Sequence, residues 1–115
     1  MQLSVSKNDA DLVCIRCAGT IREDDVQVPT HPLEALLGPG VYSRRVLMSL
    51  ELTGYVDSSG VGWLIGCHKR CLQAGGRFVL YSVPPMVTQI IRVLRIDSLL
   101  TIAGNEAEAR ILALQ

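Results

Sequence analysis

The stretch Tyr55-Val56-Asp57-Ser58-Ser59-Gly60-Val61-Gly62 marks a change of hydrophobic periodicity in the middle of the chain. Before it, residues 45–50 form a compact apolar run typical of a central strand buried on both faces, and residues 54–56 continue it after a kink. After it, the period becomes 3.6 residues, which predicts a helix that Gly75-Gly76 closes. The expected inward stripe consists of Val61, Leu64, Ile65, His68, Cys71 and Leu72. The stretch is therefore predicted to be a strand-to-helix junction.

The segments on either side of this junction extend the alternation of strands and helices. Two alternating segments, residues 3–6 and 12–18, predict an opening antiparallel hairpin that Gly19 is expected to end. A short helix is predicted at 33–37 and a strand at 77–81. A further helix is expected to start at Pro84-Pro85, with Val87, Ile90, Ile91 and Leu94 facing inward. The last predicted helix is capped by Asn105, and its inward residues are Ala107, Ile111 and Leu114. This order indicates a single α/β domain over residues 1–115, with a small mixed sheet of the hairpin and parallel strands.

The composition excludes several classes of protein. With 115 residues, 49% of them hydrophobic, the chain has the size of one domain and is too apolar to be disordered. Its 11 basic residues balance its 11 acidic ones, so it lacks the positive field typical of nucleic-acid binding, and we expect no direct contact with nucleic acid. No apolar run approaches the ~20 residues that span a bilayer, and no secretory signal is evident. We therefore expect a cytoplasmic protein without membrane insertion.

Four cysteines invite a zinc or disulfide interpretation. Cys14 and Cys17 lie in a predicted strand, where their odd spacing sends the side chains to opposite faces. Cys67 and Cys71 lie four residues apart in the predicted helix, where free cysteine usually acts as a small buried hydrophobic residue. We therefore expect buried free thiols, no metal site and no cofactor.

Two explanations account for the polar residues of the junction. In the first, Asp57 or a serine caps the helix, which contributes ~1 kcal/mol, and Gly60 permits a tight entry. In the second, Ser58 is a phosphoacceptor, because the free amides and the dipole of a helix N-terminus favour a phosphate. A phosphate would add a charge of about −1.5 to −2 and repel a partner that docks there.

A catalytic or nucleotide-binding role is a third interpretation of the same region. Gly60, Gly62 and Gly66 faintly resemble a nucleotide-binding glycine string, but close helix packing explains them better. A serine of the junction with His68 suggests a hydrolase, yet the spacing of a nucleophile elbow is absent. We therefore expect a protein that is not an enzyme.

The junction, together with Ala74-Gly75-Gly76 and Val83-Pro84-Pro85, resembles the STAS domain of bacterial anti-sigma factor antagonists. The resemblance is good from about residue 45 to the C-terminus and looser before it. It implies a small mixed sheet packed with about four helices. It also implies that Ser58, with Ser59 as second choice, is phosphorylated by an anti-sigma factor that is a serine kinase of the histidine-kinase-like ATPase type.

In that family, the unphosphorylated domain binds the anti-sigma factor and so releases a sigma factor, and a serine phosphatase restores the phosphorylated form. The resemblance therefore implies a phosphoprotein that regulates transcription as a ligand and a substrate. The alternative is a constitutive STAS adaptor in a stress-sensing or transporter-linked assembly, without a phosphoswitch. Arg22 favours this alternative, because many members carry an acid near that position, whereas the acids here, among them Asp24 and Asp25, lie downstream.

The expected partner-binding surface combines the junction with the next helix. The segment 83–100 is more apolar than one inward helix face requires, so Met86 or Val93 is expected to contribute to an exposed patch with Arg92 and Arg95 at its rim. The candidate partner-binding residues are Asp57, Ser58, Ser59, Gly60, Val61, Met86 and Val93, and Arg22, Asp24 and Asp25 are candidate neighbours of the phosphorylated loop.

Overall fold

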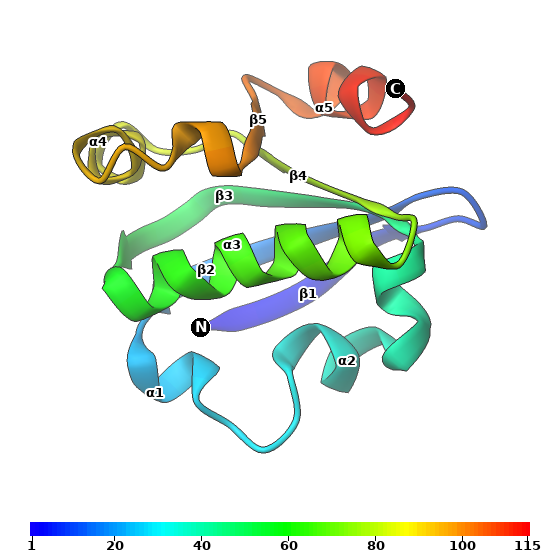
Figure 1. Ribbon diagram of the computed structural model, residues 1–115, viewed down its shortest axis with the longest axis horizontal. Coiled ribbons are helices and arrows are strands. Elements are labelled where there is room, and N and C mark those ends of the chain that lie inside the picture. Colours follow the sequence, from blue (N-terminus) through cyan, green and yellow to red (C-terminus); the bar gives the residue numbers. More distant parts are fainter.

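The sheet holds five strands in the order β1-β2-β3-β4-β5, so every strand lies beside its neighbours in the sequence (Figure 1). The structure is a computed structural model that describes residues 1–115. The strands are β1 (Gln2–Asn8), β2 (Val13–Ile21), β3 (Arg45–Val56), β4 (Arg77–Tyr81) and β5 (Thr101–Ala103). β1 and β2 pair antiparallel and all other pairs are parallel, which confirms the predicted α/β class with an opening hairpin.

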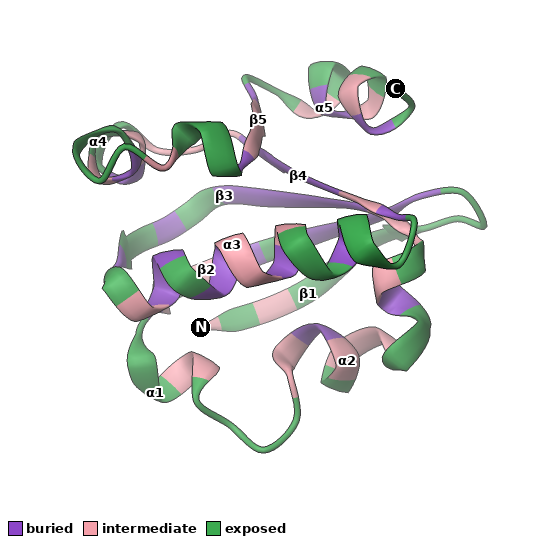
Figure 2. Cartoon of the chain, viewed as in Figure 1, coloured by how far each residue is buried: buried purple, intermediate pink, exposed green.

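Five α-helices and two 3-10 turns connect and cover the strands. They are α1 (Glu23–Val26), α2 (Pro32–Leu37), η1 (Pro39–Ser43), α3 (Ser58–Gln73), α4 (Pro85–Val93), η2 (Asp97–Leu99) and α5 (Glu106–Ala113). α3 runs along the sheet with its buried residues turned inward, and α1 and α2 lie beside it (Figures 1 and 2). None of these helices combines the length and the apolar character that crossing a bilayer requires.

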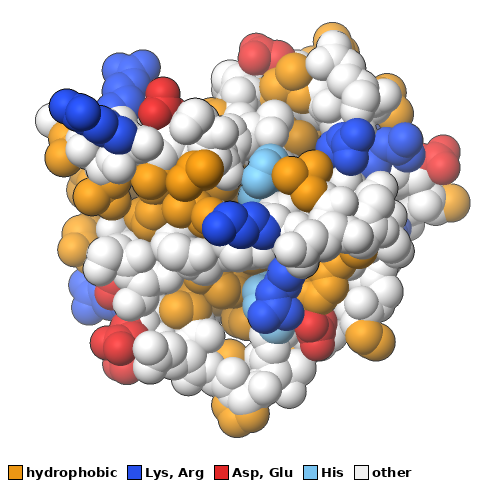
Figure 3. All heavy atoms as spheres, viewed as in Figure 1, with side chains coloured by type: hydrophobic (Ala, Val, Ile, Leu, Met, Phe, Trp, Pro, Cys, Tyr) orange, Lys and Arg blue, Asp and Glu red, His pale blue; other side chains and the backbone are white.

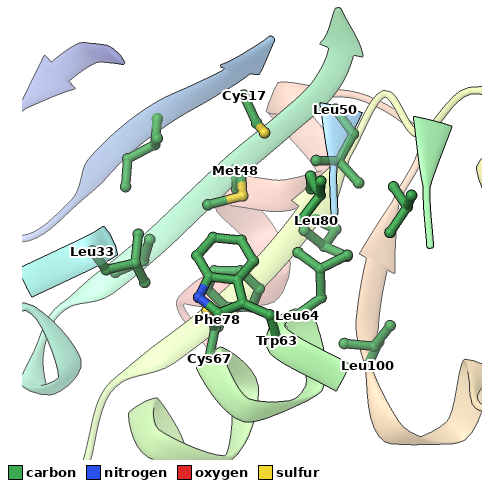
Figure 4. Packing of buried hydrophobic residues seen from close by; sticks show 14 of the residues in the cluster. Cys17, Leu33, Met48, Leu50, Trp63, Leu64, Cys67, Phe78, Leu80 and Leu100 are labelled. Atoms are coloured by element: carbon green, nitrogen blue, oxygen red, sulfur yellow. The ribbon is translucent and has the colours of Figure 1, made fainter. Parts of the chain in front are cut away.

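The central strand β3 separates two hydrophobic clusters. Its Met48 and Leu50 point into the larger cluster, which also contains the buried side chains of α3 and α4. Leu47 points the other way, into a smaller cluster that α5 covers. Figure 4 shows the larger cluster, in which Trp63, Leu64 and Cys67 of α3 pack against the sheet. The prediction of a strand buried on both faces is therefore confirmed.

The strand boundaries differ from the predictions at two places. Gly19 does not end β2, which continues to Ile21, because Gly19 adopts a φ of +88° and the pairing with β3 shifts its register there. β3 runs through residues 51–53, which the prediction left out, and on to Val56. Its pairing with β2 skips Gly54, since Gly19 pairs with Thr53 and Thr20 with Tyr55, so an irregularity lies where the kink was predicted. The longer strands bring the ends of β2 and β3 side by side at the junction. The sequence patterns also missed β5 and α1.

The inward face of α5 was predicted wrongly. Ala109 and Ala113 are buried, whereas Ala107, Ile111 and Leu114 are exposed. The helix lies close to β4 and β5, and a close approach favours small side chains at the contact. The predicted cap is present, because Asn105 Oδ1 accepts a hydrogen bond from the Glu108 amide at 2.9 Å.

Single residues of two other predicted stripes are also exposed. Leu72 of α3 and Leu94 after α4 are 49% and 48% exposed. In α3, Trp63 and Cys67 are buried instead, so the inward stripe is rotated from the predicted one. The other predicted residues of both stripes are buried or half-buried.

The segment between β2 and β3 is anchored on α3 through His31. Its ring stacks on Trp63 at a centroid distance of 5.6 Å, and the edge of Tyr42 lies 5.5 Å away. His31 Nδ1 accepts a hydrogen bond from the Leu33 amide at 3.2 Å, which caps α2. Burial, and secondarily the charge of Arg70, lower the pKa of His31. A neutral ring therefore suits this position.

We expect the stability to fall as the pH is lowered from about 7.5 to 5.5, around the ordinary histidine pKa of about 6.5. The pKa of His31 is lower in the folded chain than in the unfolded chain, so the unfolded chain binds more protons in this range. The contribution of His31 to the free energy of unfolding is therefore complete only above the ordinary histidine pKa and is lost as the pH falls below it. His31→Asn keeps a capping oxygen and removes the titrating group. Urea denaturation at several pH values should show a flatter dependence for this variant, and an unchanged slope would contradict the assignment to His31.

Candidate functional site

The carboxylate of Asp57 joins three elements at the end of β3. Its Oδ1 accepts a hydrogen bond from the Gly60 amide at 2.8 Å and so caps α3. Its Oδ2 accepts one from the Glu23 amide at 3.1 Å, at the start of α1. The Asp57 amide donates to the Ile21 carbonyl at the end of β2, at 3.1 Å. The predicted capping role of Asp57 is therefore confirmed, and its second bond, to α1, is one that the sequence did not suggest.

Gly60 allows α3 to start directly against β2. A Cβ at this position would lie 2.3 Å from the Ile21 carbonyl oxygen and 2.8 Å from Cγ1 of Val56. The tight entry into the helix that was expected at Gly60 is confirmed, because only a residue without a side chain fits against Ile21 and Val56. Gly62 and Gly66 differ, because a Cβ at either would meet nothing within 4 Å. The explanation of these two glycines by close helix packing is therefore wrong.

Ser58 lies at the exposed start of α3. It is the first helical residue, and its side chain is exposed, whereas Ser59 is half-buried. Amides in the first turn of a helix have no partner within the helix, and the helix dipole places positive potential there. Ser58 is therefore accessible to another protein and lies where a negative group is tolerated.

An apolar hollow of about 410 Å³ opens beside Ser58, between the end of β3 and α4. Met86 and Val93 of α4 are 52% and 72% exposed, as the apolar excess of this segment suggested. Figure 3 shows hydrophobic side chains at the surface on this side of the molecule, with basic groups near them. The hollow is lined by Tyr55, Val56, Asp57, Ser58, Met86, Gln89, Ile90, Val93 and Leu94.

Some lining residues were not among the sequence candidates. Tyr55 lies near the end of β3 and is 41% exposed. Gln89 and Ile90 share a face of α4 with Met86 and Val93, since they lie three or four residues apart, and this spacing was the signal available in the sequence. Conversely, the candidates Gly60 and Val61 are buried, so they shape the junction from below.

None of the three candidate neighbours around α1 lines the hollow, but Arg22 lies against a residue that does. Its guanidinium lies 5.5 Å from the centre of the Tyr55 ring. The Asp25 carboxylate instead accepts hydrogen bonds from the Met1 ammonium at 2.8 Å and from the Arg22 amide at 2.9 Å. These two bonds hold the pKa of Asp25 below its usual value, and the bond from the ammonium has the larger effect. Asp24 is exposed on α1 and does not line the hollow.

The four cysteines are free and buried, as predicted. Cys14 and Cys17 lie in different hydrophobic clusters, on opposite faces of the sheet. Burial raises the pKa of all four thiols, that of Cys71 to about 11. Because the thiolate is the reactive form, these cysteines act as apolar packing groups.

His68 lies too far from Ser58 to activate its hydroxyl. The two residues are ten positions apart on α3, which corresponds to about 15 Å along a helix. The Nδ1 of His68 lies 3.4 Å from the Phe78 carbonyl oxygen of β4. The pairing of base and nucleophile that a serine hydrolase uses is therefore not formed by these residues.

The fold and the junction together define a small α/β module with an exposed serine at a helix start, beside an apolar hollow. The family model described as STAS domain matches residues 7–109, and the chain belongs to this family. The chain is also similar to the anti-sigma F factor antagonist of Paenibacillus polymyxa, with 29% identity over 66 residues. That match covers 57% of this chain and 56% of the relative's length.

Two solved structures of SpoIIAA share the fold. The anti-sigma factor antagonist SpoIIAA in its unphosphorylated form has a TM-score of 0.67 and 18% identity, over 98% of this chain and 97% of that one. The Bacillus cell-fate determinant SpoIIAA in the phosphorylated form has a TM-score of 0.65 and 19% identity, over 96% and 98% of the two chains. At such identities these likenesses establish the fold.

We expect Gly60→Ala to lower the free energy of unfolding by about 1–3 kcal/mol, because the added Cβ overlaps the Ile21 carbonyl. The matched control is Gly62→Ala, two residues further along the same helix, where the Cβ enters open space. This control should raise stability by about 0.5–1 kcal/mol through helix propensity. Urea denaturation measures both, and equal stabilities for the two variants would refute the close contact.

Proposed function

We propose that the chain is a phosphorylation-switched protein-binding module of the anti-sigma factor antagonist type. The observation that carries the proposal is the exposed Ser58 at the rim of an apolar hollow, at the first position of a capped helix. The similarity to the Paenibacillus polymyxa antagonist supports an anti-sigma factor as the partner. Residues 1–115 are proposed to act as a single STAS-like domain in the cytoplasm, where ATP is available to a kinase.

In the unphosphorylated state, the partner is proposed to insert apolar side chains into the hollow. Met86 and Val93 expose apolar surface to water, and burying such surface contributes roughly 25 cal/mol per Å². Asp57 has both carboxylate oxygens hydrogen-bonded to backbone amides, so its charge is already compensated in the free domain. Partner binding would release the sigma factor that the anti-sigma factor holds.

Phosphorylation is proposed to transfer the γ-phosphoryl group of ATP to the Ser58 hydroxyl oxygen. The serine loses its proton, ADP leaves, and a phosphate monoester with a charge of about −1.5 to −2 remains. At the rim of the hollow, this charge loses solvation when an apolar partner approaches, which opposes binding. A serine phosphatase reverses the step by hydrolysis, which returns serine and inorganic phosphate.

A constitutive STAS adaptor is the second candidate function. The observation that favours it is the complete capping arrangement at Asp57, which explains the polar junction as a structural feature. Such an adaptor would use the same hollow in a stress-sensing or transporter-linked assembly. Its binding would not respond to modification of Ser58.

The switch is tested with baits that carry serine or genetically encoded phosphoserine at position 58. The wild-type bait should capture an anti-sigma factor from a lysate of the native host, and the phosphoserine bait should lose at least 90% of it, as quantified by mass spectrometry. The captured protein, supplied with ATP, should phosphorylate Ser58. Ser59→Glu is the control for charge at the next position. Equal capture by the wild-type and phosphoserine baits would overturn the switch in favour of the adaptor.

The hollow is tested separately with Met86→Asp and Val93→Asp. Both side chains are exposed, so the melting temperature should stay within a few degrees of wild type, because surface substitutions usually change stability by about 0.5 kcal/mol or less. Capture of the partner should be lost, because each change places a charge in the apolar contact. Ile111→Asp, at a 61% exposed position on α5, is the matched control and should retain capture. A docking role for the hollow fails if all three variants bind alike.

A further inference from the structure

The backbone holds Arg22 directly opposite the junction. The residues on both sides of Arg22 bond to Asp57: the Ile21 carbonyl accepts from the Asp57 amide, and the Glu23 amide donates to the Asp57 carboxylate. Asp57 immediately precedes Ser58 in the chain. Arg22 is therefore fixed beside the start of α3 by two hydrogen bonds of 3.1 Å.

The guanidinium of Arg22 is available to a new anion. It lies over the exposed ring of Tyr55, which lines the same hollow as Ser58. The three ion pairs of the chain join other groups, so no carboxylate occupies its five donors. At an exposed site, an aromatic face holds a guanidinium more weakly than a charge-assisted hydrogen bond does.

The neighbouring acids do not compete strongly for Arg22. The Asp57 carboxylate is used by the amides of Gly60 and Glu23, and the Asp25 carboxylate by the Met1 ammonium and the Arg22 amide. Glu23 and Asp24 are exposed in α1, and their charges are screened by solvent. A phosphate on Ser58 would bring about two negative charges to one position.

We propose that Arg22 is the phosphate-binding residue for phosphorylated Ser58. This inference rests on the proposed phosphorylation and names the residue that receives its product. The guanidinium leaves the Tyr55 ring and donates two hydrogen bonds to phosphate oxygens, the bidentate geometry that arginine favours. Arginine in this place therefore takes part in the switch, since it holds the phosphate where the partner would dock.

The pairing changes how the partner is rejected. With Arg22 bound, part of the phosphate charge is neutralised and its repulsion of Asp57 is reduced. The phosphate and the guanidinium together cover one side of the hollow, next to Tyr55. The partner is then rejected for two reasons: the paired groups block part of the hollow, and docking would have to remove water from the phosphate.

The test uses full-length protein with genetically encoded phosphoserine at position 58, so it needs neither the kinase nor the partner. The second pKa of the phosphoserine, about 6 when unpaired, is followed by ³¹P NMR titration. A nearby guanidinium favours the dianion and lowers this pKa. Arg22→Gln should therefore raise the pKa of the phosphoserine by about 0.5 unit or more. Lys69→Gln, which removes an exposed charge further along α3, should leave it unchanged.

A second signal identifies the residue directly. The Arg22 Nε proton should shift downfield when position 58 carries phosphoserine, and Arg22→Lys should give an intermediate phosphoserine pKa without that signal. Equal titrations for Arg22→Gln and Lys69→Gln, with no shift of the Arg22 Nε proton, would overturn the proposal. This result is distinct from a failure of the proposed function, in which the phosphoserine protein still captures the partner.

Discussion

The Asp57 carboxylate is the interaction on which the arrangement of this region depends. One side chain ends the central strand, caps the longest helix and holds the start of α1, through bonds to two amides that are 37 residues apart in the chain (Gly60 and Glu23). The absence of a side chain at Gly60 lets the helix begin against the Ile21 carbonyl. Together they place Ser58 at the surface and leave its hydroxyl free to react without opening the core.

The division between core and surface explains how the junction can carry a switch. Below Ser58, α3 is fixed by Val61, Leu64 and Cys67, which are buried in the larger cluster. Above it, Met86 and Val93 of α4 contribute little to the core and remain exposed. A change of charge at Ser58 therefore acts mainly on the surface offered to a partner, because the packing that stabilises the helix lies on its other face.

Local patterns of the sequence were sufficient to predict most elements and the pairing of the opening hairpin, but not every element or every inward face. The hairpin, the central strand and the capped helices follow from alternation, from the 3.6-residue period and from residues such as Asn105. The short strand β5 was missed, because three residues carry too little periodicity, and its pairing with β4 supplies the reason for its extended shape. The inward face of α5 was predicted wrongly, because hydrophobicity alone favoured Ile111 and Leu114. In the structure, the small side chains of Ala109 and Ala113 pack against the sheet instead.

The sequence by itself determined the α/β class, the strand-to-helix junction at Asp57 to Gly60, the cap of α3 and the excess of apolar residues in α4. These features depend on residues close together in the chain, so their physical causes can be recognised from spacing alone. The tertiary structure alone decided that Asp57 also binds α1, that Tyr55 and α4 form one hollow with Ser58, and that Arg22 lies over Tyr55. These contacts join segments more than 25 residues apart. The pairing of β2 with β3 sets the two contacts with α1 and Arg22, and the packing of α4 against β3 sets the hollow, and no local pattern specifies either.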